Sequence, residues 1–252
     1  MKEIFPFKIN VLHSNYYYRY GDAVSGNVKH CRKHILNDPR FSGSLLNSYF
    51  SNLKNPMQKN NYDRKLFREV VNDFMEKKSE IESRSDTLYI NIRTGDIVQI
   101  QIHRAKSDRI HEVGARLEGL YLFNHKMLIS KIEEFLKKNS MIKKISFITA
   151  MHFGNTAWNN DWMYNQQDEL TNYELMGVLY RKIQEKFPGI SVDLEVNSSA
   201  ERCDEIDDYS FEIVDEDFLK LCKSDNLIFE DGFKASGFGK MISDVRVGGC
   251  FE

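Results

Sequence analysis

The chain has 252 residues, 41% of them hydrophobic and 12% aromatic, which is enough to build one large domain or two small ones. Its 35 Lys and Arg against 37 Asp and Glu leave a net charge of -2, which argues against a strongly basic nucleic-acid binder and against a disordered chain. No apolar run reaches the roughly 20 residues of a membrane span, and the first residues show no apolar stretch of the kind expected in a signal peptide. We therefore expect a cytoplasmic protein with no integral membrane segment and no nucleic-acid partner.

The first 86 residues are expected to form an irregular segment that packs on the rest of the chain. Their apolar spacing predicts a strand at 7–13 and helices at 25–36 and 63–80, joined by an Asn- and Ser-rich connection. An aromatic run, Tyr16–Asp22, follows the predicted strand. Its rings could stack on a sugar or pack partly in a core, and both interpretations stay open.

From residue 87 onward, predicted strands and helices alternate. The strands are expected at 87–92, 98–102, 143–150, 190–196 and 225–230. Helices are expected around 128–136 and around 176–187. Two further helices are expected to begin at a cap formed by Asp215 and at Ser236. Strands that are apolar on both faces and alternate with helices predict an α/β fold: a Rossmann-like parallel sheet with helices on both faces over residues 87–252, preceded by a reduced N-terminal segment at 1–86. Such sheets bind ligands beyond the carboxyl ends of their strands.

A short polar motif, Asn91–Asp96, follows the first strand of this region. An arginine at the end of a strand, here Arg93, presents a fork of donors that matches a phosphate. Gly95 permits a tight turn, and Asp96 can hold that turn by accepting hydrogen bonds. The alternative is a strand-end turn with an exposed arginine.

A second anion-binding candidate lies near the C-terminus, where Ser236 precedes a predicted helix. Free N–H groups at a helix N-terminus favour an anion, and Gly237 and Gly239 carry no Cβ atoms that would block a diphosphate. The alternative is an ordinary serine cap with glycine packing.

Together the two segments resemble the fucosyltransferase superfamily, which includes bacterial α-1,2-fucosyltransferases and protein O-fucosyltransferases. In that family a strand ends in His-x-Arg-x-Gly-Asp, and a later "helix, strand, Ser-Ser-Phe-Ser, helix" unit follows. Asn91–Asp96 is similar to the first motif, with Asn91 in place of the histidine. Residues 220–239 are similar to the second, with Gly237 and Gly239 in place of serines. Residues 145–150 resemble a family strand that ends in an aspartate near the nucleotide base. In this sequence Met151-His152 stands in place of that aspartate.

The resemblance covers residues 87–245 and implies a GT-B-like, metal-independent glycosyltransferase of polysaccharide biosynthesis that inverts the anomeric carbon. It implies GDP-fucose or another nucleotide sugar as donor, a glycan hydroxyl as acceptor, and no further cofactor. The donor-binding residues that it implies are Asn91, Arg93, Thr94, Gly95, Thr149, His152, Ser236, Gly237 and Phe238. Arg93 would neutralise charge on the leaving diphosphate, and the base candidates are Asp22, Asp96 and His152.

Three rival interpretations remain. Asp215 and Asp217 form an Asp-x-Asp pair, which can hold Mg²⁺ or Mn²⁺ in metal-dependent glycosyltransferases, or which can simply enrich a helix N-terminus in acids. The chain could also be a non-catalytic module that binds a nucleotide or an anionic sugar. Finally, it could transfer another phosphate-linked group.

Overall fold

The structure is a computed structural model that describes residues 7–11, 29–58, 61–78, 80–81, 84–92, 94, 98, 121–152, 166–199, 211–229 and 237–246. Its elements, in chain order, are β1 (Lys8–Val11), α2 (Lys29–Asn37), η1 (Pro39–Phe41), α3 (Leu45–Asn52), α4 (Arg64–Lys77), β2 (Thr87–Asn91), α7 (His125–Lys138), β3 (Lys144–His152), α8 (Gln166–Lys186), β4 (Ser191–Ser199), α9 (Phe211–Lys223), β5 (Leu227–Phe229) and α10 (Gly237–Val245).

The chain divides into two compact units, each made of separate segments. The sheet unit comprises Met1–Ser14, Arg84–Glu205 and Asn226–Phe233. The helical unit comprises Asn15–Ser83, Ile206–Asp225 and Lys234–Glu252.

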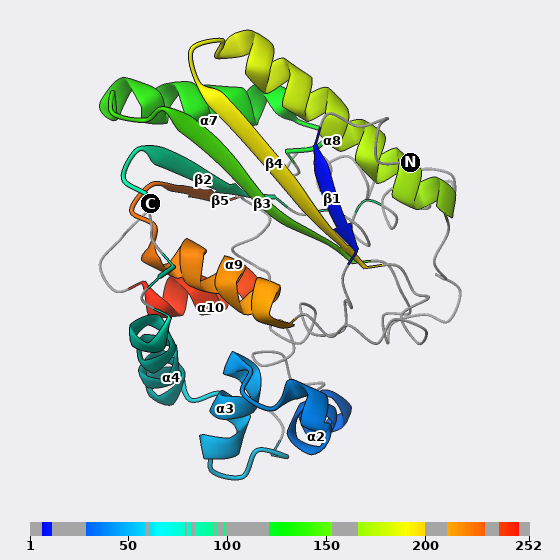
Figure 1. Ribbon diagram of the computed structural model, residues 1–252, viewed down its shortest axis with the longest axis vertical. Helices are drawn as coiled ribbons and strands as arrows, with labels where there is room; N and C mark the ends of the chain where they lie inside the picture. The colour runs from blue at the N-terminus through cyan, green and yellow to red at the C-terminus, as the bar shows by residue number, and fades with distance from the viewer. Residues whose placement is uncertain are drawn as a thin grey trace, which may run out of the picture. The chain divides into compact units, whose positions relative to one another are not determined.

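The sheet unit contains a five-stranded sheet in the order β1-β4-β3-β2-β5, with every neighbouring pair parallel (Figure 1). The chain steps from β2 to β3 to β4 in one direction and then returns to place β5 on the opposite side of β2. This reversal is the hallmark of Rossmann-like sheets. The predicted α/β fold with a parallel sheet flanked by helices is therefore confirmed.

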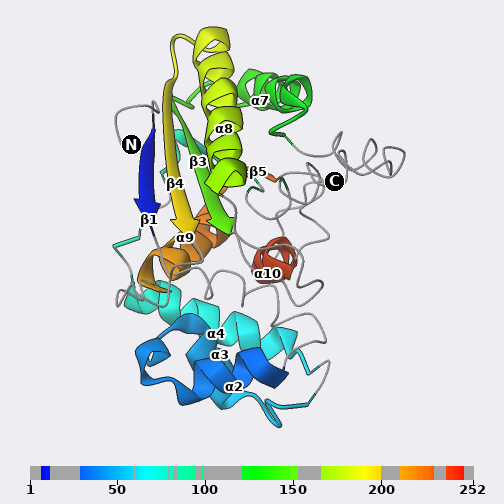
Figure 2. The same cartoon turned by 90° about the vertical axis from the view of Figure 1, so that its right-hand side faces the viewer.

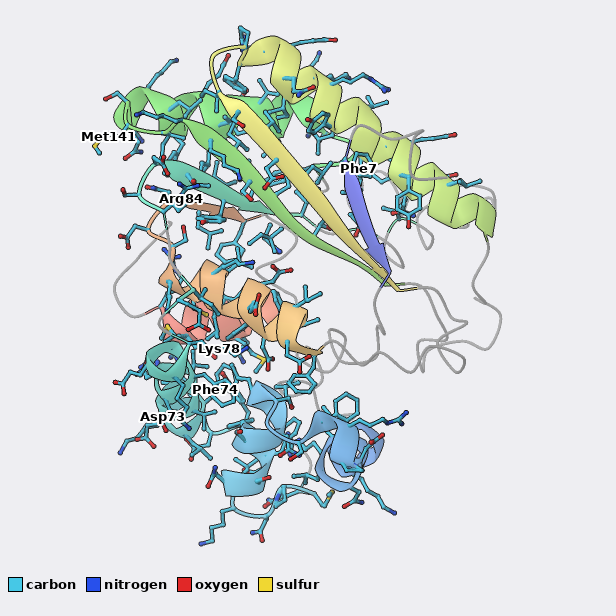
Figure 3. All side chains as sticks on the ribbon, viewed as in Figure 1. Phe7, Asp73, Phe74, Lys78, Arg84 and Met141 are labelled. Carbon is cyan, nitrogen blue, oxygen red and sulfur yellow. The ribbon has the colours of Figure 1, made fainter. Side chains whose placement is uncertain are left out.

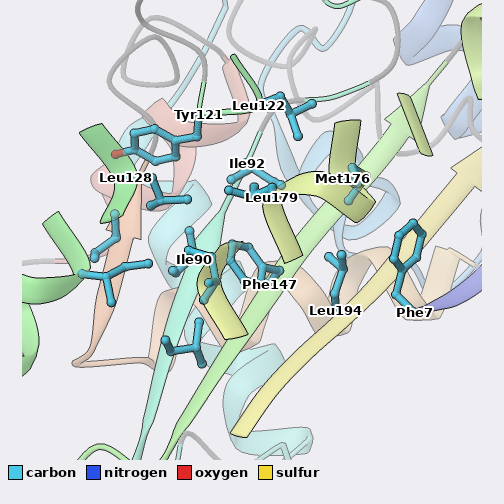
Figure 4. Packing of buried hydrophobic residues seen from close by; sticks show 14 of the residues in the cluster. Phe7, Ile90, Ile92, Tyr121, Leu122, Leu128, Phe147, Met176, Leu179 and Leu194 are labelled. Atoms are coloured by element: carbon cyan, nitrogen blue, oxygen red, sulfur yellow. The ribbon is translucent and has the colours of Figure 1, made fainter. Parts of the chain in front are cut away.

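Strand β2 is buried at all five of its positions, as expected for a parallel strand covered on both faces. Alternate strand residues share one apolar cluster with α7 and α8, and both helices lie on the same side of the sheet (Figure 2). Phe7, just before β1, contacts the ring of Tyr173 in α8 at 6.4 Å between centroids (Figure 3). The cluster members drawn in Figure 4 include Ile90, Ile92, Phe147, Leu128, Met176, Leu179 and Leu194.

Short polar side chains set where several helices begin. Ser44 accepts a hydrogen bond from Asn47 N, and Asp63 accepts one from Leu66 N, so each satisfies a backbone donor that the first helical turn leaves open. Asn124 does the same at the start of α7. These local signals explain why α4 and α7 begin within a few residues of where the apolar spacing places them, and why α3 forms inside the segment that was expected to be a connection.

Aromatic rings form the core of the helical unit. Phe67 of α4 packs edge-on against Phe218 of α9, with ring centroids 5.8 Å apart, and Phe218 packs in the same way against Phe238 of α10 at 5.4 Å. Tyr49 of α3 meets Phe67 at 5.1 Å. Because these contacts join α9 and α10 to the N-terminal helices, the two units differ from the single boundary expected at residue 87.

Charged side chains of the helical unit cap helices that are distant in sequence. Lys223 Nζ donates to the carbonyl oxygens of Met75, Lys78 and Ile81, at and just beyond the C-terminus of α4. Arg246 Nη1 donates to Leu221 and Ser224 at the C-terminus of α9. Cations at these positions satisfy open carbonyls and interact favourably with the helix dipole.

Two predictions are corrected by the fold. Asp215 was expected to cap its own helix, but α9 begins at Phe211, so Asp215 lies inside it and its buried carboxylate accepts from Leu45 N of α3 at 2.9 Å. Val98 was expected in an alternating strand, but it is helical and buried in the sheet-unit cluster. In both cases the side chain is buried against another element.

Replacing Asp215 by alanine is expected to destabilise the helical unit. The change leaves the buried Leu45 N–H without its acceptor, which costs about 1–3 kcal/mol of unfolding free energy. Glu216→Ala is the matched control in the same helix, because the Glu216 side chain is 41% exposed and forms a long ion pair, with Oε1 3.9 Å from Lys78 Nζ. Its loss should cost about 0–1 kcal/mol of unfolding free energy. Urea denaturation of both variants measures the difference, and equal losses would contradict this account of Asp215.

Candidate functional site

The strand order singles out one edge of the sheet unit as a candidate ligand site. Strand β2 has β3 on one side and β5 on the other, and the chain reaches these neighbours in opposite directions. In open parallel sheets, such a reversal separates the loops beyond the carboxyl ends of the two strands and leaves a crevice there. We call this place, where β2 ends at Asn91 and β5 ends at Phe229, the carboxyl edge.

Asn91 is a fully buried polar side chain at the carboxyl edge. It is the last residue of β2, and it is in register with Ile148 of β3 and Phe229 of β5. Its Nδ2 donates to the carbonyl oxygen of Ile148 at 2.9 Å, whereas its Oδ1 has no hydrogen-bond partner among the described residues. A buried acceptor left open costs about 1–3 kcal/mol, so this atom requires an explanation.

Two threonine hydroxyls join the residues that follow β2 to β3. Thr94 Oγ1 and Thr149 Oγ1 lie 3.1 Å apart, and both residues are buried. Thr149 continues the alternation of Ile145 and Phe147, which belong to the cluster shared with α7 and α8, whereas Asn91 is on the opposite face of the sheet. The hydroxyl pair therefore fixes the position of Thr94 inside the Asn91–Asp96 motif.

Tyr121 bonds to the carboxyl end of β5. Its buried hydroxyl donates to the carbonyl oxygen of Phe229 at 2.6 Å, and Lys131 Nζ lies over its ring, 5.6 Å from the centroid. The chain thus returns to this edge immediately before α7. Sequence reasoning missed Tyr121, because nothing in the pattern around it indicates a partner more than a hundred residues away.

His125, four residues further on, connects α7 to α8 through its Nδ1 atom. Nε2 lies 2.8 Å from the carbonyl oxygen of Leu122, and Lys182 Nζ lies 2.9 Å from Nδ1. Since a carbonyl accepts and an ammonium donates, the imidazole is neutral with its proton on Nε2. Burial, and then the charge of Lys182, hold the pKa of His125 below its ordinary value.

The structure places the predicted site residues in three groups. Asn91, Thr94 and Thr149 lie at the ends of β2 and β3, where the two threonines are paired on one face of the sheet and Asn91 is on the other. His152 is the last residue of β3, which extends two residues beyond its predicted end. Phe238 lies in the helical unit, where its buried ring packs on Phe218, and Gly237 begins α10. The predicted residues Asp22, Arg93, Gly95, Asp96 and Ser236 lie outside the described residues.

Within the described residues, no group of three His, Cys, Asp or Glu side chains is placed to hold a metal ion. In the same part of the chain, no helix combines the length and the apolar character needed to cross a membrane. Comparisons with protein-family models, with curated proteins and with solved structures found no match to this chain. The fucosyltransferase resemblance therefore rests on the sequence motifs alone.

Acidification is expected to weaken the sheet unit through His125. Folding favours the neutral imidazole of His125. The stability that this neutral ring contributes is therefore fully present above its ordinary pKa of 6.5, and it is lost as the pH falls through the lower pKa of the folded protein. His125→Asn removes the titrating ring and should flatten the decline in melting temperature between about pH 7.5 and about pH 5.5. If the melting temperatures of parent and variant fell equally over this pH range, His125 would not couple folding to pH.

Proposed function

We propose that this protein is a nucleotide-sugar-dependent glycosyltransferase, similar to fucosyltransferases, that transfers a sugar from a nucleoside diphosphate to a glycan hydroxyl. The observation that carries the proposal is the place of the Asn91–Asp96 motif in the strand order. The motif was identified from the sequence alone, and it begins at the last residue of β2, where β3 and β5 flank the strand on opposite sides. Rossmann-like sheets bind nucleotides at such a reversal.

Arg93 supplies the positive charge in this proposal. It comes two residues after the end of β2, and its guanidinium would pair with the diphosphate of the donor. The acceptor oxygen attacks the anomeric carbon, the bond from that carbon to the phosphate oxygen breaks, and the nucleoside diphosphate leaves. Arg93 then stabilises the negative charge that develops on the leaving group. A base takes the proton of the acceptor hydroxyl, and Asp22, Asp96 and His152 remain its candidates.

A non-catalytic binding module is the alternative, and the substitutions within the motifs favour it. Asn91 stands where the resemblance expects a histidine, and Met151-His152 stands where it expects an acid. Turnover separates the two functions, because a transferase hydrolyses its donor slowly without an acceptor, whereas a binding module leaves it intact. Release of free sugar from GDP-fucose is the corresponding measurement.

Arg93→Ala is expected to weaken binding of GDP-fucose without unfolding the protein. Loss of a charge-assisted contact to phosphate should cost about 1.5–3 kcal/mol, which is roughly 10- to 150-fold in Kd. Isothermal titration calorimetry in the presence of EDTA measures the change.

Arg84→Ala is the matched control for this experiment. Arg84 precedes the amino end of β2, its side chain is 64% exposed, and it lies 3.9 Å from Asp86 (Figure 3). An arginine is thus removed from the opposite end of the same strand, where the proposal expects no effect on affinity. If Arg93→Ala bound GDP-fucose as tightly as Arg84→Ala does, Arg93 would not belong to the site.

A further inference from the structure

Asn91 Oδ1 is an acceptor whose orientation is determined by its neighbours. The amide nitrogen faces the carbonyl oxygen of Ile148 at 2.9 Å, and exchanging the amide oxygen and nitrogen would place two acceptors at that distance. Oδ1 therefore points away from the Ile148 carbonyl. It is buried, and no described residue gives it a hydrogen bond.

The chemistry of this oxygen selects what can bind next to it. A side-chain amide oxygen only accepts hydrogen bonds, so its partner must carry a hydroxyl or an N–H group. An ionised phosphate oxygen is itself an acceptor and would be repelled at hydrogen-bond distance. The diphosphate of a bound donor therefore does not fill the place next to Oδ1, although it can lie against Arg93 two residues further along the chain.

The position of Asn91 links this unmet acceptor to the ligand site. The residue ends β2 in both ladders, facing Ile148 on one side and Phe229 on the other, at the reversal of the strand order. At Phe229 the carbonyl oxygen already accepts a hydrogen bond from Tyr121. Asn91 Oδ1 differs in that no described residue satisfies it, as expected of an atom reserved for a ligand.

We infer that a hydroxyl or N–H group of the bound nucleotide sugar donates a hydrogen bond to Asn91 Oδ1. This inference rests on the proposed function and adds a specificity-determining residue to it. Arg93 recognises the charge shared by all nucleoside diphosphates, whereas Asn91 recognises a donor group that distinguishes one ligand from another. A polar acceptor that must be satisfied discriminates more strongly than an apolar contact, because the wrong ligand leaves it unpaired.

Asn91→Leu tests the inference, because leucine keeps the approximate shape of asparagine and removes the acceptor. The Kd for GDP-fucose, measured by isothermal titration calorimetry, should rise by about tenfold. A parallel titration with GDP locates the donor group. A loss with both probes places it on the nucleoside, and a loss with GDP-fucose alone places it on the transferred sugar.

Asn226→Leu is the matched control. Asn226 precedes β5 at the amino edge of the same sheet, and its Nδ2 also donates to a backbone carbonyl, that of Ser85, at 2.9 Å. The chemical change is therefore the same at the opposite edge, and the Kd for GDP-fucose should stay within about twofold of the parent value.

Each outcome decides the inference. A folded Asn91→Leu protein that binds GDP-fucose as the parent does overturns it and leaves the proposed function intact. If the parent binds neither GDP-fucose nor GDP, the fucosyltransferase-like function fails and the inference fails with it. If Asn91→Leu does not fold, Asn91→Ala replaces it, and failure of both to fold shows that the amide is structural and overturns the inference.

Discussion

Burial of β2 on both faces is the constraint on which the sheet unit depends. A parallel strand with no exposed position needs a strand on each side and cover above and below it. The side chain that ends such a strand is buried as well, so a polar residue there must find partners or remain unsatisfied. Asn91 satisfies one of its groups on β3 and leaves the other open at the point where the chain reverses its strand order. The same burial thus builds the core and creates the candidate site.

The helical unit is held by a different set of interactions. Its aromatic rings pack edge to face from Tyr49 through Phe67 and Phe218 to Phe238, and its helix ends are capped by charged groups from elsewhere in the chain. Lys223 caps α4, and Asp215 bonds α3 from 170 residues away in sequence. Because its carboxylate accepts from the buried N–H of Leu45, Asp215 has a structural role in the helical unit.

The sheet could be predicted from the sequence because its signals are local. Apolar runs such as 143–150 and helical spacing such as that around Leu179 are decided within a few residues, and the predicted α/β order is confirmed. The interactions that could not be predicted join distant segments. Asp215 was expected to cap its own helix because capping is usually local, and Tyr121 gave no signal because its partner, Phe229, lies 108 residues further along the chain.

The candidate site was predicted in part, and the reason lies in its geometry. Parallel strands bring their carboxyl ends to one edge, so the position after β2 could be singled out before any side chain was placed. The pairing of Thr94 with Thr149 and the open acceptor of Asn91 depend on the register of β2 against β3, which apolar patterns do not determine. Sequence therefore located the edge, whereas its hydrogen bonding had to come from the structure.

Hydrogen–deuterium exchange with and without GDP-fucose tests the central claim most directly, because it reads out both edges of the sheet at once. The account predicts slower exchange in peptides covering residues 91–98 and 149–152, at the carboxyl ends of β2 and β3. It predicts no change in peptides covering residues 84–87 and 143–145, at the amino ends of the same strands. Protection at the amino ends, or protection confined to α2, α3 and α4, would contradict a nucleotide-sugar site at the carboxyl edge.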